Sequence, residues 1–353
     1  MIQKSPTPKW SLRTKVTTHK ISHKITSGTA ALSLLLTLSL TGCANSSQNL
    51  QQSAAELLPS VSFSADSAYA YVAAQVAFGP RVPGSESHTQ CVEWIAGKMQ
   101  AFGAEVTVTN DMGTTYDGQP QPVRNIVAKY RPDRVNRLLL CAHYDSRPFA
   151  DQDEDETKRD TPISGANDGA SGVAVLMEIG RQLQAKAPNL GVDIIFFDAE
   201  DGGTPEHKHV TDYRPDTWCI GSQIWAKSEE GRKAEHRFGI LLDMVGGRDA
   251  TFPMEMYSKS KAPEVVNKVW TVAEQLNYGA SFLRTEGGYI TDDHLYVNRL
   301  TNIPCIDIID YRLDSNMGFC PTWHTQNDVL ENIDRTTMRI VGETVLTVVY
   351  AEK

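Results

Sequence analysis

A nearly continuous apolar run that ends in acids constrains the fold of this chain more than any other stretch. Residues 192–197 read Val-Asp-Ile-Ile-Phe-Phe, and Asp198, Glu200 and Asp201 follow at once. Such a run is typical of a central strand that is buried on both faces of a parallel α/β sheet. Ligands of open α/β sheets bind just beyond the carboxyl ends of the strands. The run therefore predicts a functional site at these acids, although an isolated acidic triplet is more often a solvated loop.

Strand-like and helix-like segments alternate along the rest of the chain. Apolar strand patterns occur at residues 105–109, 125–130, 138–142, 238–245, 254–257 and 303–309. Helical spacing of apolar residues occurs at residues 66–78, where Asp66 is a candidate N-cap, and at 85–102, 169–184, 262–276 and 335–350. The alternation predicts a single α/β domain whose central, mostly parallel (mixed) sheet is flanked by helices on both faces.

The N-terminal residues are typical of an export signal. A stretch with basic residues and no acid precedes a short apolar run at residues 30–40, and Leu40-Thr41-Gly42-Cys43 follows. The run is too short to span a bilayer, and Leu-Thr-Gly-Cys resembles a bacterial lipobox; an ordinary signal peptide with an incidental cysteine is the alternative. We expect a lipoprotein signal peptide over residues 1–42, lipidation at Cys43, a flexible tether over 43–62 and a catalytic domain over 63–353.

The charge and the cysteines limit the partners and the compartment. The formal net charge is −9, and removal of the basic signal makes the chain more acidic still, which argues against nucleic acid as a partner. The lipobox predicts an exported bacterial lipoprotein that faces the periplasm, is anchored to the inner or outer membrane, and touches the membrane only through its lipid. We expect a monomer. Cys219 and Cys320 could form a disulfide in an oxidising periplasm.

Residues of the types that bind metals follow several of the predicted strands. His143 ends one apolar run, Asp243 lies in another, and Asp168 begins a helix among small residues. Together with the acids after the first strand and with His324, they would meet at one edge of the sheet. A catalytic zinc ion needs three protein ligands and one open position, and histidine and carboxylate are suitable ligands. Each residue alone is more often a turn, cap or surface residue, but the set predicts a metal site.

These motifs also carry a family resemblance. From about Phe63 onward the chain resembles the zinc-dependent aminopeptidases and glutaminyl cyclases of the M28 superfamily. It is closer to the cyclases in four segments, which are residues 78–85 (FGPRVPGS), 143–147 (HYDSR), 292–294 (DDH) and 323–325 (WHT). The resemblance implies a zinc-aminopeptidase-like fold and a glutaminyl-peptide cyclotransferase, which turns the N-terminal glutamine of peptides and exported proteins into pyroglutamate and releases ammonia.

The resemblance further assigns roles to particular residues. One Zn²⁺ would be held by Asp168, Asp201 and His324, although cyclases of this type usually have Glu at the position of Asp201. Zinc would polarise the side-chain amide carbonyl of the glutamine. The catalytic residues would be Glu200, which shuttles a proton from the attacking amine to the leaving nitrogen, and Asp243 and Asp293, which share protons with it. Trp323 would form a wall of the substrate pocket.

Two other functions remain open at this point. A two-zinc aminopeptidase would use the same residues, with a second Zn²⁺ on His143 and Asp243, Asp168 as a bridge, and Glu200 activating water. The additional acid in segment 292–294 and the bulk of Trp323 favour the cyclase. A catalytically inactive binding ectodomain is the third reading, but such a domain normally loses ligands or the catalytic acid, and all of them are present here.

Overall fold

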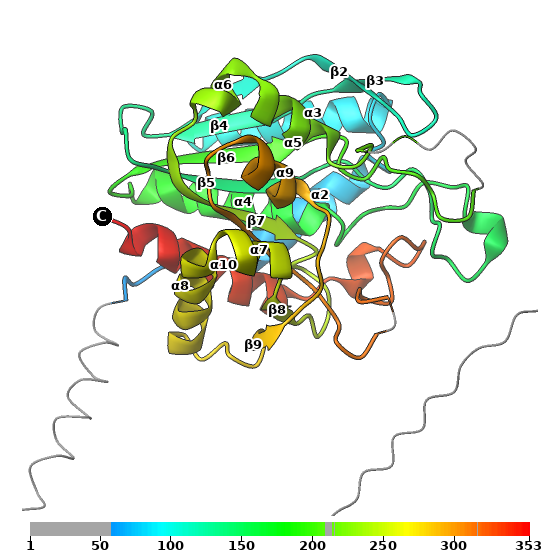
Figure 1. Ribbon diagram of the computed structural model, residues 1–353. Helices are drawn as coiled ribbons and strands as arrows, with labels where there is room; N and C mark the ends of the chain where they lie inside the picture. Colours follow the sequence, from blue (N-terminus) through cyan, green and yellow to red (C-terminus); the bar gives the residue numbers. More distant parts are fainter. Residues whose placement is uncertain (1–57, 209–213, 215, 316) are drawn as a thin grey trace, which may run out of the picture. The chain divides into compact units, whose positions relative to one another are not determined.

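A mixed β-sheet organises the part of the chain that the computed structural model describes, residues 58–208, 214, 216–315 and 317–353 (Figure 1). Strands β6, β5, β7 and β10 are parallel, whereas β4 is antiparallel to β6 and β1 is antiparallel to β4. The predicted α/β fold with a mostly parallel, mixed sheet is confirmed. Across the sheet the strands are β1 (Glu105–Val108), β4 (Ile126–Tyr130), β6 (Gly191–Phe197), β5 (Arg137–His143), β7 (His236–Asp243) and β10 (Cys305–Ile309).

Strand β6 is the predicted central strand, and all seven of its residues are buried. It can be apolar on both sides because helices cover both faces of the sheet. In its register with β5, His143 lies opposite Phe197. The two parallel strands therefore end level with each other, and the loops that follow them start from the same edge.

The larger core lies on one face of the sheet, under five helices. Helix α4 contributes an almost continuous buried surface from Ala170 to Gly180, and α10 packs against α2, α4 and α8. The helices of this face are α2 (Ala65–Ala77), α3 (Glu86–Ala101), α4 (Ala170–Ala185), α8 (Pro263–Gln275) and α10 (Arg335–Ala351).

A smaller core on the opposite face lies under shorter helices. Phe197 and Cys141 of the sheet pack there with Trp225 and Val297. The helices on this side are α5 (Ile220–Lys227), α6 (Glu229–Lys233), α7 (Met256–Lys261) and α9 (Asp293–Leu300), and α5 packs against α9. Two small sheets, β2 (Asp111–Thr114) with β3 (Pro120–Val123) and β8 (Phe252–Met254) with β9 (Phe282–Glu286), and the turns η1 (Glu156–Lys158) and η2 (Leu330–Asn332) complete the described elements.

Two local predictions are wrong because of capping contacts. The predicted strand at 254–257 is instead the end of β8 and the start of α7, since the Glu255 carboxylate accepts hydrogen bonds from the backbone N–H groups of Tyr257 and Ser258. Helix α2 is capped by Ser64 and not by Asp66, because the Ser64 hydroxyl accepts from the N–H of Ser67.

The start of the chain and the cysteines need separate comment. The predicted signal peptide, Cys43 and most of the tether lie outside the described residues, whereas Leu58 and Val61 already pack against the large core. Among the described helices, none is long and apolar enough to cross a membrane. Cys219 and Cys320 are both buried free thiols, so the disulfide considered between them is not formed.

Candidate metal centre and active site

The carboxyl ends of β5 and β7 bring three of the predicted residues into contact. His143 is the last residue of β5 and Asp243 is the last of β7. His143 Nε2 lies 3.0 Å from Asp168 Oδ1 and 3.2 Å from Asp243 Oδ1. Gly169 allows this approach, because a Cβ atom there would lie 2.4 Å from His143 Nε2. The glycine that follows Asp168 is therefore required by packing against the histidine ring.

Asp168, Asp201 and His324 meet as the predicted ligand set. His324 Nε2 lies 3.1 Å from Asp201 Oδ1 and 3.6 Å from Asp168 Oδ2, and all three side chains are buried. Within the described residues, neither carboxylate oxygen of Asp201 receives a well-aligned hydrogen bond. Its ion-pair contacts with His324 and, at 3.8 Å, with Arg147 leave buried negative charge beside Asp168. Buried charge is costly, and a cation shared with the other two side chains would compensate it. Two carboxylates and one imidazole are a donor set that fits zinc.

A buried ion pair holds the other side of His324. Its Nδ1 lies 3.3 Å from Asp151 Oδ1, and Asp151 in turn accepts a hydrogen bond of 2.7 Å from Arg147. A carboxylate in this position orients a metal-binding imidazole and leaves its Nε2 free for the metal. Arg147 also donates to the backbone carbonyl oxygens of Asp201 and Gly203, at 2.8 and 3.1 Å, so one guanidinium positions two of the three ligands.

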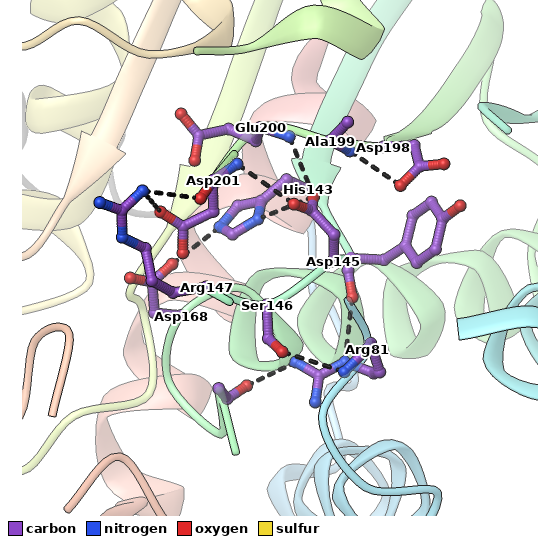
Figure 2. A network of polar contacts seen from close by, with 12 residues as sticks. Arg81, His143, Asp145, Ser146, Arg147, Asp168, Asp198, Ala199, Glu200 and Asp201 are labelled. Atoms are coloured by element: carbon purple, nitrogen blue, oxygen red, sulfur yellow. Dashed lines mark hydrogen bonds and ion pairs between the residues drawn. The ribbon is translucent and has the colours of Figure 1, made fainter. Parts of the chain in front are cut away.

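Two further aspartates hold the ligand loops through backbone amides. The Asp145 carboxylate accepts hydrogen bonds of 3.1 Å from the N–H groups of both Glu200 and Asp201 (Figure 2). Asp328 does the same for the loop before α4, since it accepts from the N–H of Asp168 at 3.1 Å and from that of the preceding residue at 2.7 Å. The acids of the predicted ligand set are thus positioned by acids outside that set.

Arg81, from the segment 78–85, is a fully buried cation whose hydrogen bonds go to backbone carbonyls. Its guanidinium donates to the carbonyl oxygens of Tyr144, Ser164 and Gly165 at 3.0, 2.6 and 2.7 Å. Figure 2 shows it below Ser146, whose hydroxyl accepts from the Arg81 N–H. Arg81 therefore joins the loop after β5 to the loop that leads to Asp168.

Three carboxyl groups line a small cavity beside the ligand set. They are Glu200, Asp243 and Asp292, and all three are buried. Burial raises the pKa of each, and the negative charge of Asp292 raises the pKa of the other two further. The Cys219 thiol donates to Glu200 Oε1 at 3.1 Å. A buried carboxyl with a raised pKa is suited to take up and return a proton near neutral pH.

The cavity beside Glu200 is lined by an acid other than the one named from the sequence. Asp292 is the N-cap of α9 and lines the cavity, whereas Asp293, the first residue of α9, is buried outside that lining. Asp243 makes its close contact with His143 and not with Asp293. The sequence predicted Asp293 for this role and the cavity lining favours Asp292, because side chains one residue apart at a helix start point in different directions.

Two tryptophan rings lie beside His324 of the predicted ligand set. Trp323 stacks on His324 with 3.8 Å between ring centroids, and the Trp218 ring is parallel to that of His324 at 6.2 Å. Both line the small cavity, as predicted for Trp323. Trp218 was not assigned a role from the sequence, and its place depends on a distant glycine, since a Cβ on Gly203 would lie 1.9 Å from the indole.

Residues with a strained backbone conformation lie around the same cavity and ligand set. Ala199, Cys219, Met244 and His324 are non-glycine residues with φ between 49° and 55°. Such a conformation costs about 1–3 kcal/mol and persists where the surrounding structure enforces it, which is often at functional sites. Each of these residues is, or adjoins, a residue of the cavity or ligand set.

A second group of ligand atoms shares Asp168. His143, Asp168 and Asp243 each offer one atom within 4.8 Å of the others, as do Asp168, Asp201 and His324. The positions predicted for a second metal are therefore also assembled. The arrangement of ligands by itself accommodates one ion or two.

The fold and this site define an α/β domain of the zinc-aminopeptidase type. The chain belongs to peptidase family M28, whose model matches residues 125–349, and the resemblance found in the sequence is thereby confirmed.

Two solved bacterial structures are similar to this chain over nearly their whole length. A glutaminyl cyclase from Tannerella forsythia is 54% identical, with a TM-score of 0.81, over 83% of this chain and 100% of that chain. A Zn-dependent exopeptidase from Parabacteroides distasonis is 52% identical, with a TM-score of 0.80, over 82% and 99%. The glutaminyl-peptide cyclotransferase of Bos taurus is 26% identical over 290 residues, which are 73% of this chain and 74% of the bovine protein.

Proposed function

We propose that this protein is a zinc-dependent glutaminyl-peptide cyclotransferase that converts N-terminal glutamine to pyroglutamate and releases ammonia. The observation that carries the proposal is the group of three buried carboxyls, Glu200, Asp243 and Asp292, directly beside the ligand set and under Trp218 and Trp323. The similarity to bacterial and bovine cyclases supports the same reaction.

The residues that would hold zinc are Asp168, Asp201 and His324. When bound there, zinc supplies a Lewis acid that polarises the γ-amide carbonyl of the glutamine. Glu200 then accepts a proton from the α-amine as its nitrogen bonds to the amide carbon, and returns that proton to the amide nitrogen as the carbon–nitrogen bond breaks and ammonia leaves. Asp292 lines the same cavity, and its negative charge, together with burial, raises the pKa of Glu200, which supports a role for Glu200 in holding a proton.

The two tryptophans decide which nucleophile reaches the amide. A water molecule that attacked the same carbon would give glutamate instead of pyroglutamate. Trp218 and Trp323 flank His324 and line the small cavity of about 50 Å³. A glutamine side chain seated beside these rings would displace water from the cavity, which favours the intramolecular amine, already held close to the amide carbon.

A two-zinc aminopeptidase is the second candidate, because His143, Asp168 and Asp243 could hold another ion. We infer that a single zinc ion serves the reaction, since Asp243 lines the cavity together with Glu200 and Asp292 whereas His143 does not. A second ion would turn Asp243 from a proton-holding group into a ligand. Metal analysis of the purified protein distinguishes one zinc per chain from two.

We also propose the cellular location, the membrane anchor and the partners of this protein. The lipobox at Cys43 supports an exported bacterial lipoprotein that faces the periplasm and acts on exported proteins with N-terminal glutamine. The acidic charge supports the absence of a nucleic-acid partner, and we expect a monomer that touches the membrane only through its lipid. Fractionation of cells that express the protein or its Cys43→Ser variant tests the anchor, because only the intact cysteine should give membrane-bound protein.

The activity test uses purified Cys43→Ser protein with zinc and the peptide Gln-Phe-Ala, followed by mass spectrometry. Loss of one ammonia from an otherwise intact peptide is the result expected of a cyclase. Free glutamine and a shortened peptide would show an aminopeptidase and contradict the proposal. An unchanged peptide together with protein that binds no zinc would identify an inactive binding domain.

A further inference from the structure

The start of helix α5 holds the loop that carries Glu200. Cys219 is the N-cap of α5, and its N–H group donates to the Glu200 carbonyl oxygen at 2.8 Å. The next two N–H groups of α5 donate to the carbonyl oxygens of Ala199 and Asp198, at 3.0 and 2.9 Å. N–H groups at the start of a helix have no partner within the helix itself. Their hydrogen bonds therefore fasten the backbone of the loop to α5.

Gly221 and Asn125 strengthen this contact at the Asp198 end of the loop. A Cβ atom on Gly221 would lie 2.2 Å from the Asp198 carbonyl oxygen, so a side chain there would collide with the loop. The Asn125 side chain donates to the Gly221 carbonyl oxygen at 2.9 Å and accepts from the Asp198 N–H at 3.0 Å. The backbone of the loop is thus held without any contribution from the Cys219 side chain.

The Cys219 side chain makes a separate contact with the catalytic acid itself. Its thiol donates to Oε1 of Glu200 at 3.1 Å, and within the described residues no other hydrogen bond reaches the Glu200 carboxyl. Glu200 lines the small cavity, whereas Cys219 is fully buried and does not line it. The thiol therefore holds one oxygen of the carboxyl from outside the cavity and leaves the other oxygen for the substrate.

The backbone conformation of Cys219 shows that its side chain has a specific role. Its φ of 55° lies in the left-handed region, which glycine adopts far more readily than cysteine. Cys219 belongs to none of the apolar clusters of the described residues, so packing in a core does not explain a cysteine here. Burial and the negative charge of Glu200 raise the pKa of the Cys219 thiol. The thiol therefore keeps its proton and acts as a hydrogen-bond donor.

We propose that Cys219 is a positioning residue of the cyclase, whose thiol holds the Glu200 carboxyl in the orientation from which its second oxygen accepts the proton of the substrate α-amine. This inference rests on the proposed function and adds to it a residue that does not contact the substrate. Cys219 exchanges no proton itself and acts only through Glu200. A small displacement of a reacting group lowers the rate of a positioned reaction strongly. Loss of the thiol should therefore lower kcat and leave KM unchanged.

The test compares kcat and KM, measured as ammonia release from Gln-Phe-Ala, and zinc content for the wild type and its variants. Cys219→Ala removes the donor and should lower kcat by about tenfold, with KM and zinc content at the wild-type level. Cys219→Ser keeps a donor on the same side chain and should restore most of kcat. Cys91→Ala is the matched control, because Cys91 is an equally buried thiol that lies in the larger core and does not line the cavity. Its kcat should equal that of the wild type.

Cys219→Gly is a second variant without the thiol, and it keeps the test decisive if the alanine variant does not fold. Glycine adopts a positive φ without strain, so this variant suits the backbone at the start of α5. Its kcat should fall as far as that of Cys219→Ala. Urea unfolding of each variant shows that the protein measured is folded.

The outcomes separate the role of Cys219 from the function beneath it. Wild-type kcat in folded Cys219→Ala or Cys219→Gly, with normal pyroglutamate formation, would overturn the positioning role and leave the cyclase intact. A loss that Cys219→Ser does not restore, or that Cys91→Ala shares, would also overturn it, since the donor would then not be the cause. Failure of both the alanine and the glycine variant to fold would show a structural role instead. Release of no ammonia by the wild type would overturn the cyclase and the positioning role together.

Discussion

Buried carboxylates occur at both ends of the parallel strands, but Asp193 at the amino end is paired with basic groups, whereas Glu200 and Asp292 at the carboxyl end form no ion pair within the described residues. At the amino end, Asp193 of β6 accepts hydrogen bonds from His236 at 2.8 Å and from Arg137 at 3.2 Å. Burial alone would raise the pKa of Asp193, and these two partners outweigh it and lower the pKa. At the carboxyl end, burial raises the pKa of Glu200 and of Asp292.

The difference separates acids that stabilise the fold from acids that are available for chemistry. A buried charge with well-placed partners is held in one ionisation state. A buried carboxyl without such partners can change its ionisation near neutral pH. It also lowers the stability of the fold, so such carboxyls are typical of functional sites. The comparison therefore predicts that substitutions at the carboxyl end alter activity and that substitutions at the amino end alter stability.

The largest expected effect is that of Glu200→Gln. The amide cannot shuttle a proton, so kcat for Gln-Phe-Ala should fall by about 10²- to 10⁴-fold. Zinc content should stay at the wild-type level, because Glu200 is not one of the three proposed ligands. Ammonia release and metal analysis on the same preparation measure both quantities, and a variant that loses its zinc would contradict the assignment of ligands.

The next effect tests which acid of the pair 292–293 works with Glu200. Asp292→Asn removes a carboxyl from the cavity and should lower kcat by about 10²-fold. Asp293→Asn is the matched control, since Asp293 is equally buried but lies outside the cavity lining. Its effect should stay below about tenfold. A larger loss in the Asp293 variant would restore the role that the sequence had predicted for it.

At the amino end, Asp193→Asn should lower stability and leave kcat unchanged. The substitution removes the negative partner of Arg137, whose side chain is 14% exposed. Loss of one member of a buried ion pair costs about 3 kcal/mol, because the other charge stays buried without compensation. Urea unfolding measures the loss.

Glu230→Gln, which removes the exposed partner of Lys129, is the control and should cost less than about 1 kcal/mol. A lower kcat in the Asp193 variant would contradict the prediction that substitutions at the amino end alter stability and not activity.

The fold and most of the site follow from the sequence because they depend on local patterns. Apolar runs that end in Asp, Glu or His predicted β5, β6 and β7 and placed their acids at one edge of the sheet. The roles of Arg81 and Asp145 were not predictable in the same way, since their partners lie up to 84 residues away. Trp218 likewise depends on space that Gly203 leaves open. Contacts of this kind exist only once the chain is folded.

The choice between adjacent residues was the least predictable part. Asp292 and Asp293 are identical in sequence terms, and the start of α9 decides which of them faces the cavity. That start depends in turn on Glu255, whose carboxylate accepts from the Ile290 N–H at 3.1 Å and from His294 at 3.0 Å. Glu255 was itself placed in a strand by the sequence. A paired buried acid, Glu255, thus helps to position the segment from which the unpaired Asp292 reaches the cavity.

Glu255 gives the smallest predicted effect, and it tests whether a paired acid holds the segment that carries Asp292. Burial alone would raise the pKa of Glu255, but hydrogen bonds from His294 and from the N–H groups of Ser258 and Tyr257 lower it to about 2, against 4.5 for an ordinary glutamate. Because the pKa is lower in the folded state, the stabilisation is complete well above pH 4.5 and is lost as the pH falls towards 2.

The wild-type protein should therefore lose about 1 kcal/mol of stability relative to Glu255→Gln when the pH falls from 6 to 4. Urea unfolding of both proteins at each pH gives this difference, and any release of zinc at low pH cancels because both proteins keep the three ligands. If the two stability curves run parallel, Glu255 is not held in its ionised form by His294 and the helix amides. The orientation of Asp292 would then need another cause.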